Sequence, residues 1–383
     1  MNVYLDNSAT TRPSAAVVAA AGELMESGWY NPSALYKPAL EIEKRIDRTR
    51  ETCLQAAGAP GQRIVFTSGG TEADNLALLG HLRTRRAPGK VLFSSVEHPA
   101  VSACAEEIRH MGFGTETIPA GKDGRINLAA LEELLDEKTI LISVMQVNNE
   151  TGAAEPLAEI AKLRDRKAPG AAIHVDGVQG FLRMDLGFNR LGIQSYALSG
   201  HKIHGLKGTG ALILRKDHPI RPIQFGGGQE VNLRSGTENT FGILSLGEAV
   251  ISWDPEANVR MRKLKNRLRA GIIERIPTAE VNGPGEDPET SAPHILNMAL
   301  PPVRSQTMLF ALEGDGIYVS AGSACASRKQ KISPVLKAMG VSTEQADCSL
   351  RFSLCPMTTE EEIDYAAERA GTHWEMLRKF TRR

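Results

Sequence analysis

The sequence predicts an α/β protein built around a mostly parallel β-sheet that helices cover on both faces. Short runs rich in apolar and β-branched residues recur through the middle of the chain, and helical stretches separate several of them. The length of 383 residues is large for a single hydrophobic core and favours two lobes. Such sheets bind ligands beyond the carboxyl ends of their strands, so the residues that follow each strand are the first candidates for a site.

Six runs have the length and composition of strands. They cover residues 63–68, 90–95, 139–147, 172–176, 195–198 and 210–215. Helices are expected from about Thr71 onward and over residues 156–166. This alternation of strands and helices is typical of a parallel sheet with crossover connections.

The pattern changes near residue 252. Apolar residues then recur at helical spacing with Arg and Lys between them, at Val259, Met261, Leu264, Leu268 and Ile272. Beyond a turn at 282–285, strand-like pieces over 295–300 and 317–320 alternate with helical pieces over 334–339 and 359–369. These features predict a second, smaller α+β lobe from about residue 252 to the end.

Composition excludes some classes of function. The chain has 45 Lys+Arg and 45 Asp+Glu, so its zero net charge does not favour nucleic acid or an anionic membrane as the main partner. It has neither an apolar run long enough for a membrane span nor the features of a signal peptide, and we expect a cytoplasmic protein. The five cysteines form no CxxC pair, so neither a disulfide framework nor a zinc site is indicated.

A glycine-rich turn joins the predicted strand 63–68 to the helix expected from about Thr71 onward. Residues 65–73 have the sequence VFTSGGTEA. Free N–H groups at a helix start suit a phosphate, Gly70 lets the backbone approach it, and Thr71 adds a hydroxyl. The turn is neither a P-loop nor GxGxxG. A plain strand-to-helix turn capped by threonine is the alternative.

His174 and Asp176 share one face of the strand 172–176. A carboxylate at the end of a buried strand is costly unless it meets a cation or hydrogen-bond donors. The two residues are too few to hold a metal. Asp176 is therefore interpreted either as the partner of a protonated ring nitrogen in a cofactor or as a structural residue that caps a turn.

Lys202 follows the strand 195–198 in the segment SGHKIHG. Most lysines are solvated, but the polar, glycine-containing turn around this one is typical of a Schiff-base nucleophile. A phosphate-binding turn, an acid for a ring nitrogen and a lysine together favour pyridoxal 5'-phosphate as the cofactor.

Small residues surround Cys325 in the segment SAGSACAS, which predicts a mobile loop with an accessible thiol. A buried cysteine in a small-residue packing contact is the alternative. Arg234 and Arg351 are candidates for binding a substrate carboxylate, because a guanidinium holds a carboxylate with two hydrogen bonds. Surface or structural roles are the alternative for both.

Ordered motifs along the whole chain resemble those of the cysteine desulfurases of NifS/IscS type, in the class V aminotransferase group. The matching segments are YLDNSATT at 4–11, FTSGGTEADN at 66–75, EH at 97–98, VNNETG at 147–152, HVD at 174–176, SGHK at 199–202, RSGT at 234–237 and GSAC at 322–325. The resemblance implies the type I pyridoxal-phosphate-dependent transferase fold. Residues 15–251 would form a large domain with a seven-stranded sheet, and residues 1–14 and 252–383 a small domain that carries the Cys325 loop.

The resemblance also implies the roles of the matching residues. Lys202 would form the Schiff base and move protons, while His98 would stack on the cofactor ring as the acid/base candidate. Asp176 would keep the ring nitrogen protonated. Arg351 would bind the substrate carboxylate. Cys325 would attack the sulfur of L-cysteine, which leaves L-alanine and a persulfide.

The same resemblance assigns the remaining contacts. The phosphate of the cofactor would be bound by Gly70, Thr71, Ser199 and His201. Asn149 and Gln179 would contact either the phenolic oxygen of the cofactor or the substrate. Thr237 matches a position that reaches the phosphate of a partner subunit, which implies a homodimer. No metal is implied.

The fifteen residues at 326–340 resemble the long-loop group of the family, which serves iron–sulfur assembly and tRNA thiolation. The expected partner is therefore a sulfur acceptor such as an iron–sulfur scaffold or a tRNA-thiolation protein. Three departures leave the acceptor open: the basic run at 328–331, Cys355-Pro356 where glycine is common, and the short stretch after Trp374.

Two other functions remain as alternatives. One is a related enzyme on the same fold, such as a selenocysteine lyase or a small-amino-acid aminotransferase, although a transaminase needs no thiol at Cys325. The other is a non-catalytic sulfur-trafficking or regulatory module, against which the intact set of Lys202, Asp176, His98 and Cys325 argues.

Overall fold

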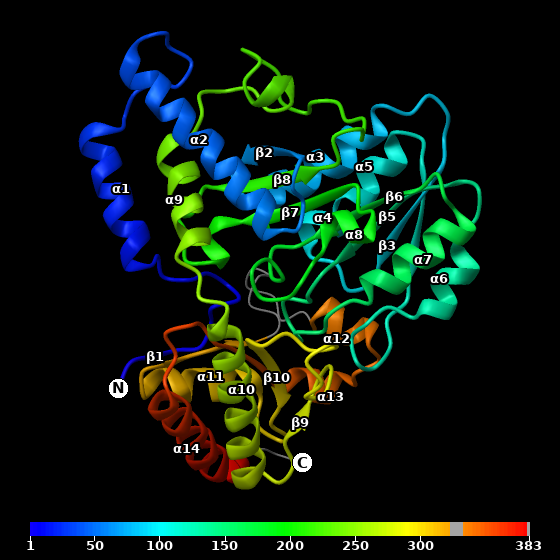
Figure 1. Ribbon diagram of the computed structural model, residues 1–383. Helices are drawn as coiled ribbons and strands as arrows, with labels where there is room; N and C mark the ends of the chain where they lie inside the picture. Colours follow the sequence, from blue (N-terminus) through cyan, green and yellow to red (C-terminus); the bar gives the residue numbers. More distant parts are fainter. Residues whose placement is uncertain (322–331, 381–383) are drawn as a thin grey trace.

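A seven-stranded sheet forms the centre of the larger part of the molecule in the computed structural model, which describes residues 1–321 and 332–380 (Figure 1). Its strands lie in the order β2 (Arg63–Thr67), β8 (Gly210–Leu214), β7 (Ser195–Ser199), β6 (Ala172–Asp176), β5 (Thr139–Met145), β3 (Lys90–Ser94) and β4 (Gly114–Ile118). Only β8 runs antiparallel to its neighbours in this sheet. The predicted mostly parallel sheet is confirmed.

The six predicted strands agree with the structure to within two residues at each end. Strand β4 was not among the six predicted strands; it pairs in parallel with β3 at the edge of the sheet. Its sequence, GTETI, has glycine and glutamate at positions that face solvent, so it lacks the apolar pattern of the central strands.

Both faces of the sheet are covered by helices, because alternate strand residues point to opposite sides. Ile64, Ile142 and Val175 belong to one cluster with helices α2 (Lys37–Ala56), α6 (Leu128–Leu134), α7 (Leu157–Lys167) and α9 (Thr240–Ile251). On the other face, Val91 and Phe93 pack with α3 (Gly70–Leu82) and α5 (Cys104–His110). Shorter or more peripheral helices are α1 (Ala15–Ser27), α4 (Pro99–Ser102), α8 (Phe188–Leu191), η1 (Gly200–Lys202) and η2 (Glu230–Asn232).

The smaller part of the molecule holds a four-stranded antiparallel sheet in the order β12 (Ser320–Ala321), β13 (Ser349–Ser353), β10 (Ile295–Ala299) and β9 (Glu280–Val281). The predicted amphipathic helix is α10 (Glu256–Arg275), which packs against α14 (Glu360–Leu377) (Figure 1). The remaining elements are α11 (Ser305–Gly314), α12 (Pro334–Ala338), α13 (Thr343–Asp347) and η3 (Arg378–Phe380). The single strand predicted over 317–320 is wrong: it divides into β11 (Ile317–Tyr318) and β12, which belong to different sheets.

The N-terminal segment lies with this smaller part. Its strand β1 (Val3–Tyr4) pairs in parallel with β11, and Asp6 forms a bridge with Ser353 of β13. Val3 and Leu5 join the hydrophobic cluster of α10, β10 and β13. These contacts are consistent with the division into 15–251 against 1–14 and 252–383, whose boundaries stay a prediction.

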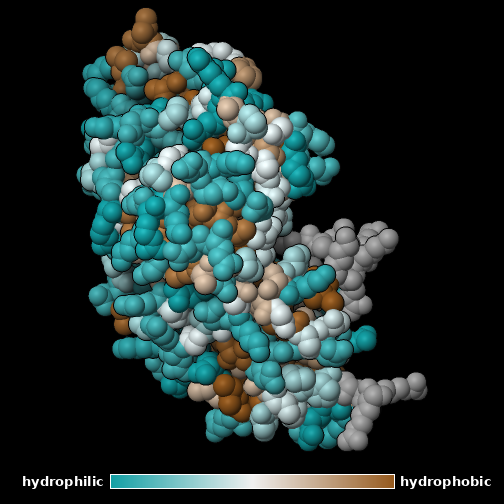
Figure 2. Space-filling model, turned by 90° about the vertical axis from the view of Figure 1, so that its right-hand side faces the viewer, coloured by the Kyte–Doolittle hydropathy of each residue, from teal (hydrophilic) through white to brown (hydrophobic). Residues whose placement is uncertain are grey.

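The surface is mainly hydrophilic on the face drawn in Figure 2, where hydrophobic side chains gather only in small patches. Within the described residues, no helix combines the length and apolar character needed to cross a membrane.

Candidate active site

The carboxyl ends of five strands meet at one edge of the large sheet and bring the predicted residues together. Asp176 ends β6, and Lys202 follows β7 within η1. His98 and Asn149 lie in the segments after β3 and β5, and Gly70 begins the helix after β2. This is where an α/β sheet binds its ligands.

The turn predicted to bind phosphate lines a cavity of about 420 Å³. Helix α3 begins at Gly70, and no side chain caps the N–H groups of its first turn. A Cβ on Gly70 would lie 2.4 Å from Cγ2 of Val178, so only glycine fits there. The cavity is lined by Ser68, Gly69, Gly70, Thr71, Ser199 and His201, among others. Free backbone donors, hydroxyls and the positive end of a helix dipole fit a phosphate group.

Three charged side chains, Glu72, Arg234 and Lys207, lie in or next to this cavity. Nε of Arg234 lies 2.8 Å from Oε1 of Glu72, and Oε2 of Glu72 accepts the N–H of Ser68 at 2.7 Å. Arg234 therefore neutralises an acidic residue in the first turn of α3, which favours its structural alternative over binding a substrate carboxylate. Lys207 lines the same cavity and adds a cation that the sequence analysis did not single out.

The amine of Lys202 is held by the N-terminal segment. Its Nζ donates to the carbonyl oxygens of Ser8 at 2.5 Å and Ala9 at 2.9 Å. Burial lowers the pKa of Lys202 to about 8. The cations Arg351 and Arg183 act in the same direction, whereas nearby carboxylates oppose it. An amine with this pKa is a competent nucleophile near neutral pH.

Asp176 is buried, and its Oδ1 accepts the N–H of Val178 at 2.9 Å. Burial raises the pKa of this carboxyl, and the nearby His98 and Lys202 oppose the rise. The cations that act on the pKa of Asp176 are His98 and Lys202, and the backbone N–H of Val178 is the donor that contacts it. A proton on a cofactor ring nitrogen would supply a further cationic partner, so the acid fits the predicted role.

His98 caps the short helix α4. Its Nδ1 accepts the N–H of Ala100 at 3.1 Å, so the neutral ring carries its proton on Nε2. Burial lowers the pKa of His98, Asp176 opposes this change, and Lys202 adds to it. The neutral imidazole can accept or return a proton beside Lys202 and Asp176.

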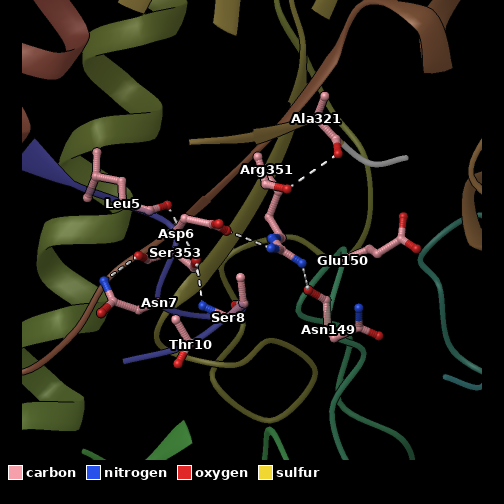
Figure 3. Close-up of polar contacts among 12 residues, drawn as sticks. Leu5, Asp6, Asn7, Ser8, Thr10, Asn149, Glu150, Ala321, Arg351 and Ser353 are labelled. Atoms are coloured by element: carbon pink, nitrogen blue, oxygen red, sulfur yellow. Dashed lines mark hydrogen bonds and ion pairs between the residues drawn. The ribbon is translucent and has the colours of Figure 1, made fainter. Parts of the chain in front are cut away.

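The side chain of Arg351 on β13 points toward Asp6 and Asn149 (Figure 3). Its Nη2 donates to Oδ1 of Asp6 at 2.7 Å, and its Nη1 donates to the carbonyl oxygen of Asn149 at 2.9 Å. Its Nε is buried without a partner, which leaves a donor that suits a carboxylate. Asp6 was not a candidate, since nothing local in the sequence marks it as a contact of Arg351.

The remaining predicted site residues have different surroundings: two form hydrogen bonds to the N-terminal segment, one is exposed, and one is not described. Nε2 of Gln179 donates to the Ser8 carbonyl at 2.9 Å, and Nδ1 of His201 lies 3.1 Å from Oγ1 of Thr10. Thr237 is exposed on this chain, as a contact to a partner subunit would require. Cys325 lies outside the described residues, so its role stays a prediction.

His174 is buried and forms contacts with other side chains of the protein, which are typical of a structural role. Its Nε2 lies 3.1 Å from Oδ1 of Asp74 and its Nδ1 lies 2.9 Å from Oγ of Ser195, with all three residues buried. Across residues 1–321 and 332–380, no group of three or more His, Cys, Asp or Glu side chains could hold a metal ion.

Comparisons with known proteins show the family of this chain. The Aminotransferase class-V family matches residues 3–366, and the chain belongs to this family. Its members bind pyridoxal phosphate as a Schiff base with a lysine.

Named relatives narrow the class further. The chain is 36% identical over 370 residues to the cysteine desulfurase IscS of Clostridium botulinum, covering 96% of this chain and 92% of the relative. It is 35% identical to the cysteine desulfurase NifS of Azotobacter vinelandii, covering 95% and 90%. A solved NifS-like protein superimposes with a TM-score of 0.91 at 32% identity, covering 98% of this chain and all of that one.

Proposed function

We propose that this protein is a pyridoxal-phosphate-dependent cysteine desulfurase that converts L-cysteine to L-alanine and transfers the sulfur to Cys325. The observation that carries the proposal is that Lys202, Asp176 and His98 lie close enough together to change one another's pKa. They do so at the edge of the sheet where the glycine-rich turn before α3 lines a cavity. The relatives named cysteine desulfurase support the choice of reaction within the family.

Each residue has a task that follows from its position. The bound cofactor supplies an electron sink for the bonds at the substrate Cα. Lys202 would anchor the cofactor and then move a proton at Cα, while Asp176 holds the proton on the ring nitrogen. Arg351 would bind the substrate carboxylate, since its buried Nε has no partner. His98 would accept or return protons with its neutral ring.

The sulfur step falls to Cys325. Its thiolate would form an S–S bond with the substrate sulfur as the Cβ–S bond breaks. The electron pair of that bond stays with the carbon fragment, which is protonated to L-alanine. The persulfide on Cys325 would then pass its terminal sulfur to an acceptor thiol.

The proposed function also implies protein partners. We infer a cytoplasmic homodimer in which Thr237 reaches the phosphate of the partner subunit, and its exposure on this chain supports the inference. The acceptor would be an iron–sulfur scaffold or a tRNA-thiolation protein. Labelling Cys325 with L-[35S]cysteine and measuring transfer of the label to a scaffold protein and to a tRNA-thiolation protein shows which of the two is the acceptor.

Replacement of the thiol tests the reaction. Cys325→Ala should bind the cofactor with unchanged absorption but lose sulfide release from L-cysteine. Cys104→Ala, which changes a buried cysteine on α5, is the matched control and should keep the activity. Full sulfide release by Cys325→Ala would contradict the assignment. Transfer of an amino group to a keto acid at the wild-type rate in that variant would instead favour an aminotransferase.

A further inference from the structure

A chain of hydrogen bonds leads from Lys202 to a buried histidine outside the predicted site. The carbonyl oxygen of Ser8 accepts both Nζ of Lys202 at 2.5 Å and Nε2 of Gln179 at 2.9 Å. Oε1 of Gln179 lies 3.3 Å from Nε2 of His294. His294 precedes β10 in the smaller part of the molecule, so the chain crosses between the two parts.

The chemistry of these atoms determines the orientation of each group. A carbonyl oxygen only accepts hydrogen bonds, so the Gln179 atom that faces Ser8 must be its NH₂ group. The other amide atom is then the oxygen, which also only accepts. His294 must therefore carry a hydrogen on Nε2 to complete the contact with Gln179.

His294 is held in the neutral form with this tautomer. The residue is completely buried, and burial lowers its pKa well below the ordinary value. The charged groups that face it are all cations, from the segment after β6, α10, β13 and η1: Arg183, Lys265, Arg351 and Lys202. Its backbone is anchored as well, because the His294 carbonyl accepts the N–H of Leu354 at 2.8 Å.

We propose that His294 is a positioning residue whose Nε2–H fixes the amide of Gln179, so that the second amide hydrogen of Gln179 is available to the phenolic oxygen of the cofactor. The inference rests on the proposed function, and of the two contacts that the family resemblance implies for Gln179 it takes the phenolic oxygen. A donor there stabilises the phenolate and lowers the pH at which the Schiff-base nitrogen loses its proton. Without His294 only the hydrogen bond to the Ser8 carbonyl holds the amide, which can then tilt its second hydrogen away from the phenolic oxygen.

The test follows the pH midpoint of the visible absorption of the bound cofactor. His294→Leu should raise the midpoint by about one pH unit, and His294→Gln, whose Nε2 can replace the ring N–H, should restore it. Gln179→Leu should raise it by a similar amount, and the double variant His294→Leu/Gln179→Leu should shift it no further. His218→Leu removes a buried histidine elsewhere and should leave the midpoint unchanged.

Two outcomes would overturn the proposal: an unchanged midpoint in His294→Leu, or two independent shifts that add in the double variant. If His294→Leu does not fold, nitrogen NMR of histidine-labelled wild-type holoenzyme decides, because the proposal requires the Nε2–H tautomer at His294. Failure of the proposed function gives a different result, since borohydride would then fix no cofactor to Lys202 in the wild type.

Discussion

Arg351 shows at the scale of one residue how a buried guanidinium is held in place with one donor unused. Its guanidinium is held on two sides by Asp6 and the carbonyl of Asn149, while Nε remains without a partner. The side chain is 9% exposed, so these hydrogen bonds are formed away from bulk water. The guanidinium spreads five N–H donors over three nitrogens, so it can keep both supports and still bind a carboxylate, whereas the donors of a lysine all lie on a single nitrogen.

Arg351→Lys should therefore raise the KM for L-cysteine about tenfold, because a charge-assisted hydrogen bond of roughly 1.5 kcal/mol is lost. The absorption of the bound cofactor should not change. Steady-state kinetics on the variant checks the expectation, with Arg267→Lys in an exposed ion pair as the control. An unchanged KM would remove Arg351 from the substrate site.

The turn before α3 shows at the scale of an element why glycine is needed at position 70. The contact with Val178 comes from the turn after β6, so two elements share one small space. The strand-end residues Ser199 and Gly210 pack against the same turn. The backbone N–H groups of α3 can reach a phosphate only while this packing is kept.

Gly70→Ala should weaken binding of pyridoxal phosphate about 10- to 100-fold, as expected for a close contact that costs about 1–3 kcal/mol. The double variant Gly70→Ala/Val178→Ala should recover most of the affinity, because it removes the atom 2.4 Å away. Gly22→Ala, where a Cβ meets nothing within 4 Å, is the control. Equal affinities in the single and double variants would contradict the packing argument.

The segment before α7 contains a buried acid that should make stability depend on pH. Burial raises the pKa of Glu155 to about 8, although its Oε2 accepts the N–H of Ile126 at 2.9 Å. The folded protein thus keeps a proton that the unfolded chain releases above about pH 4.5. This contribution to stability is complete below pH 4.5 and is lost as pH rises toward 8.

Glu155→Gln should remove that dependence, because the amide resembles the protonated acid. Relative to wild type, the variant should gain unfolding free energy by at most about 1.4 kcal/mol per pH unit between pH 4.5 and 8. Urea unfolding at pH 5 and pH 8 measures the difference. Glu133→Gln, an exposed residue, should show none of it, and a gain that is equal at both pH values would be evidence against a buried protonated acid.

The N-terminal segment joins the two parts of the whole molecule at the active site. Leu5 is fully buried in the cluster of the smaller part, and Ser8 accepts the hydrogen bond of Lys202 in the larger part. Asn7 donates to the carbonyl of Ser353, so the segment is attached to the strand that carries Arg351. The lysine and the arginine are thus positioned by one short stretch of chain.

Leu5→Ala should lower the unfolding free energy by about 2–5 kcal/mol, since a buried leucine is replaced by a cavity. Val18→Ala, which changes an exposed residue on α1, should alter it by less than about 0.5 kcal/mol. Urea unfolding of both variants gives the comparison. A loss as small as that of the control would mean that the segment is not tightly packed.

Local patterns in the sequence were enough for the central strands, the amphipathic helix α10 and the glycine-rich turn before α3. Each depends on residues close together in the chain, such as alternating apolar positions or glycines before a helix. The resemblance to a known family added the seven-stranded sheet and the residue roles. The edge strand β4 and the division of 317–320 between two sheets were missed, because pairing partners decide such strands more than their own residues do.

The sequence by itself determined the kind of cofactor site, since the motif residues carry the required chemistry. Only the tertiary structure decided what holds them. Asp6 meets Arg351 across 345 positions of sequence, and Ser8 meets Lys202 across 194. His294 reaches Gln179 across 115. Contacts between residues so far apart in the sequence depend on how the two parts of the chain pack together. The spacing of residues within a short segment cannot predict that packing.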